Sequence, residues 1–418
     1  MPNFKILSWL LFAFLFSIPL CFAHEDALVD HHDVIHINKS LSLSQLVSQV
    51  SDKFPEQLIN AGLQQEVNAL KQRGNSWLAA APSISLRYQD DSPADDVGLR
   101  EMETELNLPL WNWGQKKAAQ DVANKAFLSS KTYYRLIKLK VAGLVRQALW
   151  NMKLERIRFT QAKSILGFSE KLLTTIKRRV ELGDLATSDL LLAQSDHLQK
   201  RSRVIQAEAE MMHARQRYIN LTQTHGIPIN FKEERSNITD ITEDHPKVSA
   251  IIAMIKRKQA KVNWIKSAGS GNPVFTVGGK SERGDRNADD IESMSFGISI
   301  PFGGADHLAP DIAAANMELS EALVQKAFLF RNLNIELHEA EHALEISRVE
   351  LQMAIELKTI SEKQLKMSQL SFDEGEINLI DFLKIQSQSN QAIRQAKESN
   401  TLYQKNIAMY NQAVGAQP

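Results

Sequence analysis

One segment in the middle of the chain recurs near its C-terminus, and this recurrence constrains the fold more than any other feature. Residues 181–195 read ELGDLATSDLLLAQS, and residues 374–387 read EGEINLIDFLKIQS. In both, an aspartate follows a glycine after six positions, and matching positions lie 192 residues apart. The identical pairs are Gly183 and Gly375, Asp189 and Asp381, Leu191 and Leu383, Gln194 and Gln386, and Ser195 and Ser387.

Prolines recur at nearly the same interval and in the same order. Pro55 and Pro246 lie 191 residues apart, as do Pro82 and Pro273, while Pro109 and Pro301 lie 192 apart. Coincidence can supply one such pair, but hardly several in one order. The chain is therefore predicted to be two tandem copies of one structural unit. The first repeat is expected at 24–222, a connector at 223–244 and the second repeat at 245–418.

Residues 1–23 have the pattern of a secretory signal peptide, and cleavage is expected before His24. Lys5 precedes an apolar run at 6–20 that is too short to span a bilayer as a helix. The only cysteine, Cys21, is removed with this segment, so disulfides and thiol catalysis are not expected. Lipidation of Cys21 is the alternative, although the preceding Leu20 is larger than such a site usually tolerates.

Charge and hydropathy narrow the class of protein further. Removing Lys5 from the 49 basic side chains leaves 48 against 49 acidic ones, so nucleic acid is not an expected partner. After the signal peptide no run of 18 apolar residues remains, and a membrane-spanning helix is not expected. A closed barrel of strands is then the remaining way for this chain to cross a bilayer.

Each repeat reads as a helix, two strands, a long helix and a return helix. Apolar residues of the long helices recur at coiled-coil spacing, and the first of these helices would be roughly 100 Å long. Gly183 ends it as a C-terminal glycine, and Thr187 or Ser188 can cap the return helix. The repeated segment is then the tip of a long helical hairpin. The helices are expected at about 41–81 (broken at Pro55, stopped at Pro82), 115–182, 187–222, 246–267, 312–373 and 379–414.

The predicted strands alternate apolar and polar residues over about 8–11 positions, the length that a tilted membrane strand needs. One face suits lipid and the other a wet lumen, whereas two soluble hairpins on a core are the alternative. Four strands cannot close a barrel, so several chains must contribute, and three chains would supply twelve strands. The strands are expected at 83–90, 99–110, 273–281 and 292–302. The residues expected to line the lumen are Arg87, Glu101, Glu103 and Glu105. The carboxylates of the three glutamates would favour cations.

These features resemble the TolC-like outer-membrane efflux proteins over essentially the whole mature chain. The resemblance rests on the duplication, the prolines that open strands, LPL at 108–110, IPF at 300–302, and the glycine turns followed by DLL and DFL. It implies an α+β membrane protein: a homotrimer with a twelve-stranded β-barrel in outer-membrane lipid and a coiled-coil α-helical tunnel in the periplasm. The tunnel would dock onto a periplasmic adaptor protein and an inner-membrane efflux pump.

The same resemblance implies roles for the hairpin tips, which in that family contact the adaptor and pinch the inner end of the tunnel shut. Asp381 matches an acidic position of the constriction, while Lys384 stands where a second acidic residue often lies. A surface pair between Asp381 and Lys384, three residues apart on one helix, is the alternative. The tip residues expected to contact the adaptor are Arg179, Leu182, Gly183, Asp189, Glu374 and Gly375.

No enzyme and no cofactor are expected. The residues SDH at 195–197 are consecutive on a helix and cannot face one another. The residues GKS at 279–281 lack the earlier glycine of a phosphate loop, since Val274 stands there, and they lie on a predicted strand. No His, Cys and carboxylate spacing matches a catalytic zinc motif.

The start of the mature chain carries a histidine-rich tract, His24, His31, His32 and His36, with three aspartates among them. Imidazole and carboxylate together suit zinc, copper, nickel or cobalt, whereas a flexible polar terminus is the alternative. The tract and the compact length resemble the branch of the family that serves heavy-metal exporters.

The predicted function is a passive exit duct, in which a separate pump supplies the energy and chooses the solute. The alternative is a soluble periplasmic coiled-coil scaffold or adaptor that transports nothing. Two pairs of strands of membrane-spanning length favour the duct, because an adaptor does not need them.

Overall fold

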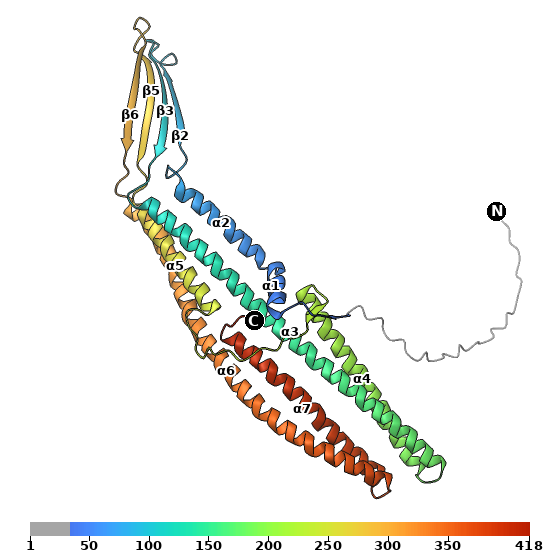
Figure 1. Ribbon diagram of the computed structural model, residues 1–418. Coiled ribbons are helices and arrows are strands. Elements are labelled where there is room, and N and C mark those ends of the chain that lie inside the picture. The colour runs from blue at the N-terminus through green and yellow to red at the C-terminus, as the bar shows by residue number, and fades with distance from the viewer. Residues whose placement is uncertain (1–33) are drawn as a thin grey trace, which may run out of the picture.

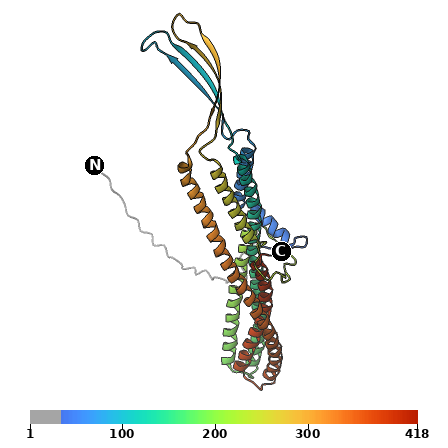
Figure 2. The same ribbon diagram turned by 90° about the vertical axis from the view of Figure 1, so that its left-hand side faces the viewer.

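The computed structural model describes residues 34–418, apart from the side chain of Ala305. The predicted signal peptide, Cys21 and the histidines at 24, 31 and 32 lie outside the described residues. The described chain is elongated, with a four-stranded sheet at one end and the turns of two helical hairpins at the other (Figures 1 and 2). None of its helices combines the length and the apolar character that a membrane span requires.

The same order of elements occurs twice along the chain. The first half contains β1 (His36–Asn38), α1 (Leu43–Lys53), α2 (Gln57–Asn75), β2 (Ser83–Asp90), β3 (Arg100–Pro109), α3 (Gln115–Glu181) and α4 (Thr187–Thr222). The second contains β4 (Gly226–Pro228), α5 (Pro246–Ser267), β5 (Val274–Arg283), β6 (Ile291–Ser299), α6 (Ala305–Asp373) and α7 (Leu379–Ala413).

The helices lie side by side across the molecule. Near the sheet the order is α2, α3, α5, α6, because α3 contacts α2 and α5, and α5 contacts α6. Toward the hairpin turns the order is α4, α3, α7, α6. Helix α6 therefore forms one edge of the chain, and α2 and α4 form the other edge (Figure 1).

The main sheet is antiparallel throughout, in the order β2-β3-β5-β6, and the β3–β5 pairing joins the two halves of the chain. Its register gathers the apolar residues on one face: Leu106 lies between Ile84 of β2 and Val277 of β5, and Val277 lies opposite Phe296 of β6. Because side chains alternate along a strand, the other face is polar. All four strands lie within three residues of their expected bounds.

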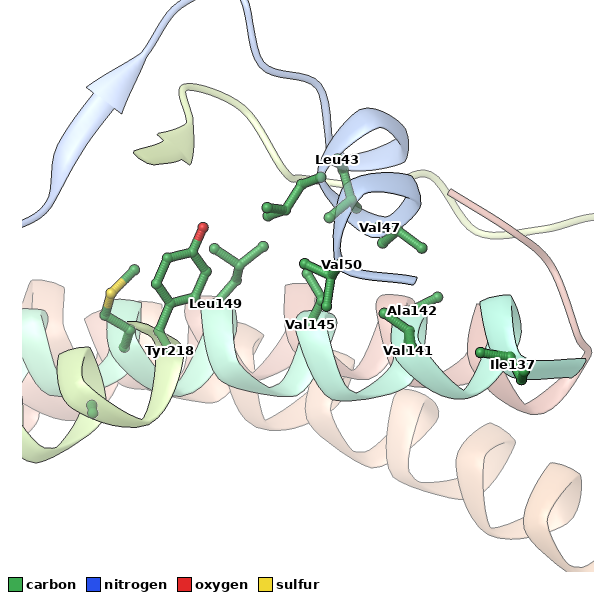
Figure 3. Close-up of a cluster of buried hydrophobic side chains, with 12 residues drawn as sticks. Leu43, Val47, Val50, Ile137, Val141, Ala142, Val145, Leu149 and Tyr218 are labelled. Atoms are coloured by element: carbon green, nitrogen blue, oxygen red, sulfur yellow. The ribbon is translucent and has the colours of Figure 1, made fainter. Parts of the chain in front are cut away.

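A core in the middle of the molecule holds α1 against α3 and α4 (Figure 3). Ser42 and Gln45 form a capping box at the start of α1, and apolar residues four and seven positions on from Leu43 face α3. Tyr218 of α4 is fully buried here and donates its hydroxyl hydrogen to the Gly226 carbonyl at 2.6 Å. Burial raises the pKa of Tyr218 to about 12.

A buried arginine ties three distant segments together beside this core. The guanidinium of Arg146 on α3 binds both carboxylate oxygens of Glu233, at 2.8 and 2.6 Å. It also donates to Gln412 Oε1 at 2.7 Å and to the Ala416 carbonyl at 3.1 Å. Helix α3, the segment after β4 and the C-terminal residues are thereby held at one point.

Three local expectations are wrong. Helix α2 ends at Asn75 rather than near 81, because the chain then turns toward the sheet and the Ala79 amide binds the Pro109 carbonyl at 3.0 Å. Helix α6 begins at Ala305 rather than near 312 and continues through Pro310. Because Pro310 lies close to the start of the helix, it removes few backbone hydrogen bonds. Ala186, not Thr187 or Ser188, is the N-cap of α4.

One small sheet was not anticipated. Strands β1 and β4 pair in parallel, with His36 opposite Gly226 and Asn38 opposite Pro228. Each strand has only three residues, too few for an alternating pattern to stand out. The predicted connector 223–244 thus contains a strand that binds the N-terminal part of the described chain.

Candidate functional site

Both hairpins turn on the same backbone motif. Gly183 after α3 and Gly375 after α6 each have φ of 80°, a left-handed conformation that costs other residues roughly 1–2 kcal/mol. The Gly183 amide donates to the Val180 carbonyl at 3.0 Å, and the Asp184 amide donates to the Arg179 carbonyl at 2.8 Å. This is a Schellman motif, and the Gly375 turn repeats both bonds. Glycine therefore stands at both positions because it adopts this left-handed conformation without the strain that another residue would have.

The side chains that close the two turns differ. Arg179 Nε donates to Asp184 Oδ2 at 2.6 Å, an ion pair across the first turn. At the equivalent positions of the second turn, Ser371 Oγ donates to Glu376 Oε2 at 2.8 Å. The two tips therefore share a backbone but not a charge distribution.

The equivalent aspartates after the turns also have different partners. The Asp189 carboxylate accepts a hydrogen bond from the Ala186 amide at 3.3 Å, and Ala186 has no side-chain acceptor to return the bond. In the second hairpin Asn378 is the cap, and its Oδ1 accepts from the Asp381 amide at 2.9 Å. Within residues 34–418 the Asp381 carboxylate itself has no hydrogen bond or ion pair.

Asp381 and Lys384 are both exposed on α7, and no bond joins them within the described chain. The surface pair that the spacing allows is therefore absent. Both side chains are free to meet groups from outside this chain, and their role at a constriction stays a prediction.

An apolar cluster that the sequence reasoning missed packs the two tips together. Ile176 and Ala193 of the first hairpin meet Phe372, Leu379 and Phe382 of the second, all buried. The rings of Phe372 and Phe382 stack with centroids 5.0 Å apart. Phe382 lies in the repeated segment, where it marks the second copy of the repeat. Its position in the sequence does not show that its side chain packs against the other hairpin.

Arg179 reaches across to this cluster. Its guanidinium lies 5.4 Å from the centroid of the Phe372 ring, and its Nη1 donates to the Phe372 carbonyl at 3.4 Å. Only 21% of its side chain is exposed, whereas Leu182 is 75% exposed. Arg179 thus links the two hairpins of one chain, whereas Leu182, Gly183, Glu374 and Gly375 are exposed. Adaptor contact through the tip residues stays a prediction.

The four predicted lumen residues share the polar face of the sheet, as their register requires. Arg87 Nη1 lies 3.5 Å from Glu103 Oε2, and Lys280 of β5 lies 3.1 Å from Glu101 Oε1. Glu105 lies opposite Gly278 and has no ion pair within the described chain. Two of the three carboxylates therefore have an ion-pair partner, and Lys280 is shared between Glu101 and Glu282. Lys280 was missed because the sequence cannot reveal its cross-strand partner.

Three exposed aromatic side chains surround the base of the sheet. Trp77 precedes β2, Trp113 follows β3 and Phe302 follows β6, and each is more than 90% exposed. Their exposure at one end of the sheet makes them a candidate contact surface.

No cluster of three or more His, Cys, Asp or Glu able to hold a metal occurs within residues 34–418. His36, the only member of the histidine tract in this range, stacks on His225 with ring centroids 6.4 Å apart. The part of the tract before residue 34 lies outside the described residues.

No protein-family model and no curated protein match the chain. Several solved structures are similar to the chain. One is CusC, with 14% sequence identity and a TM-score of 0.71, and the match covers 91% of this chain and 93% of that one. The outer membrane protein VceC from Vibrio cholerae has a TM-score of 0.72 at 11% identity, covering 90% and 96%. The open MtrE outer membrane channel of Neisseria gonorrhoeae has a TM-score of 0.67 at 13% identity, covering 90% and 89%. With its strand–hairpin architecture over nearly its whole length, the chain has the fold of the TolC-like outer-membrane efflux channels.

Proposed function

We propose that this chain is the outer-membrane exit duct of a tripartite efflux system, passing solutes outward from an inner-membrane pump and a periplasmic adaptor. The observation that carries this proposal is the sheet: four strands with one apolar and one polar face, set at the end of a helical body. The likeness to CmeC, an outer membrane channel of Campylobacter jejuni, over 99% of this chain supports it. A soluble scaffold would not need a sheet whose apolar face is open to its surroundings.

The edges of the molecule argue for a closed ring of copies. One edge is formed by β6 and α6, and the opposite edge by β2, α2 and α4. Unlike edges of one chain that meet in a neighbouring copy make a head-to-tail contact, which closes into a ring when the rotation allows. The β6 edge of one copy would meet the β2 edge of the next in antiparallel fashion, because β2 is antiparallel to β3 and three such pairings separate it from β6. Three copies would give twelve strands.

The helical edges carry matching apolar stripes. Helix α4 exposes Leu191, Leu198 and Ile205 at intervals of seven residues. Helix α6 buries one seam against its own chain and exposes a second, which includes Ile346, Val349, Met353, Ile360 and Met367. Seven-residue spacing on both helices is what a coiled-coil contact requires. Each stripe is proposed to cover the other in the adjacent copy.

Disulfide cross-linking tests this arrangement, since residues 24–418 contain no cysteine. A ring has no axial shift between copies, so positions at about the same distance from the tips should meet where they lie on facing sides of the two helices. Leu198 is residue 12 of α4, and Ile360 is residue 14 from the end of α6. Leu198→Cys with Ile360→Cys should give a covalent trimer in outer-membrane fractions. The matched control pairs Leu198→Cys with Glu362→Cys on another face of α6, and a periplasmic monomer would end the duct proposal.

Ion selectivity tests the lumen. Because Glu105 lacks an ion pair and Glu103 is paired with Arg87, Glu105→Gln should move the reversal potential in a salt gradient more than Glu103→Gln. Equal or absent shifts would remove this sheet face from the ion path.

Asp381, whose carboxylate has no partner within the described chain, is proposed to line the inner constriction. Asp381→Ala should therefore raise single-channel conductance, and wild-type conductance would contradict that role.

The proposed solute is a heavy-metal cation, and this proposal rests on the histidine tract alone. Deleting residues 24–37 and measuring tolerance to zinc, cobalt and copper tests a heavy-metal cargo. Wild-type tolerance to all three would remove the tract from the mechanism and leave drugs or other small molecules as the cargo.

A further inference from the structure

A cavity of about 600 Å³ lies beneath the small β1–β4 sheet, far from the hairpin tips and from the main sheet. Helices α3 and α4 form its floor, and β1, β4 and the residues that follow β4 cover it. Most of its lining is apolar and includes Ile35, Met152, Ile157, Met211, Ile227 and Phe231. Its size is within the range of small-molecule sites, and the proposed duct makes no use of it.

The charged groups at this cavity are all cations. Lys153 and Arg156 of α3, Arg215 of α4 and Lys397 of α7 line it, and no carboxylate from residues 34–418 does. Lys397 donates to Gln161 Oε1 at 2.9 Å. Within residues 34–418 neither Lys153 nor Arg156 has an ion pair or a side-chain hydrogen bond. The excess of positive charge from Lys153 and Arg156 at the rim would attract an anion.

Lys153 stands between aromatic rings. Its ammonium lies 5.0 Å from the centroid of Trp150 and 5.5 Å from that of Phe231. Partial burial, followed by repulsion from Lys232, lowers the pKa of Lys153. A carboxylate bound beside the ammonium would oppose this lowering of the pKa, because an opposite charge favours the charged form.

The shape and the charge specify one class of ligand. Lys153 and Arg156 are exposed at the rim, while Met152 and Met211 are buried at the floor. A molecule that suits both has an anionic head and one aliphatic chain. We propose that this cavity binds a long-chain carboxylate, with its tail over Met152 and Met211 and its head between Lys153 and Arg156.

Fluorescence quenching by a brominated fatty acid tests the proposal on the full chain in a non-ionic detergent. Trp150 is buried and lies 4.9 Å from Phe231, a lining residue, measured between ring centroids. Dibromostearate should therefore quench a saturable component that is lost in Trp150→Phe, whereas quenching of exposed tryptophans in the micelle persists in both. The uncharged methyl ester should bind about tenfold more weakly, the difference expected for a hydrogen bond to a charged group.

Substitutions at the rim separate head recognition from simple partitioning. Lys153→Met should weaken carboxylate binding about tenfold and leave ester binding unchanged, and Lys153→Arg should restore part of the loss. Lys163→Met, at an exposed position of α3 outside the cavity, is the matched control and should bind as the wild type does. Equal affinity for acid and ester, or no Trp150-dependent component, would overturn the proposal.

Discussion

Replacing Arg146 by methionine should loosen the junction between α3, the segment after β4 and the C-terminal residues. The arginine side chain is fully buried and that of Glu233 is 11% exposed, so the substitution leaves a nearly buried carboxylate without its cation. Removing one partner of such a pair costs about 3–5 kcal/mol. The Gln412 and Ala416 oxygens lose donors as well, which keeps the expected loss in the upper part of this range.

Amide hydrogen exchange measures this loss locally. The Ser236 amide donates to Asn411 Oδ1 at 2.8 Å, and Asn411 Nδ2 donates to Glu233 Oε2 at 3.4 Å. Exchange of the Ser236 amide therefore reports opening of the junction. Because each 1.4 kcal/mol is about tenfold in an equilibrium, exchange there should accelerate by roughly 10³-fold or somewhat more in Arg146→Met.

A second ion pair on the same helix is the matched control. Lys140 pairs with Glu56, but their side chains are 55% and 27% exposed, so Lys140→Met should cost at most about 1 kcal/mol. Arg146→Met combined with Glu233→Leu should recover part of the loss, because the uncompensated charge is gone. If Arg146→Met and Lys140→Met change exchange equally, the argument from burial is refuted.

Three further predictions concern the turns, the tip cluster and pH. Gly183→Ala should destabilise the first hairpin by roughly 1–2 kcal/mol, because residue 183 has a positive φ. Gly167→Ala should stabilise the hairpin by about 1 kcal/mol, because Gly167 lies inside α3 with open space around it. Urea unfolding followed by circular dichroism measures whether the two changes in unfolding free energy have opposite signs. Phe372→Ala should cost about 3–5 kcal/mol and accelerate exchange at both tips, and an effect on the second tip alone would contradict the shared cluster. Burial lowers the pKa of His245, so the unfolded chain takes up a proton first and stability should fall as pH drops from about 6.5 toward the lower folded value; a His245→Asn variant should lack this slope in thermal melts.

Features encoded over a few neighbouring residues were accessible from the sequence. Alternation set the strands to within three residues of their observed bounds, and the glycines at 183 and 375 marked both turns because only glycine takes a positive φ there without strain. Local rules failed where a distant contact competed with them: α2 ends early because the Ala79 amide binds the Pro109 carbonyl at the end of β3.

What the sequence determined by itself is the series of elements, their lengths and the polar face of each strand. Only the tertiary structure decided which residues meet across that face and across the tips. Lys280 neutralises Glu101 because β5 pairs with β3 in one register, and a shift of one residue would have sent it to the other face. Arg179 binds the Phe372 carbonyl because the hairpins pack tip to tip. Such partners lie well over 150 residues apart, and a pattern read over ten residues carries no information about them.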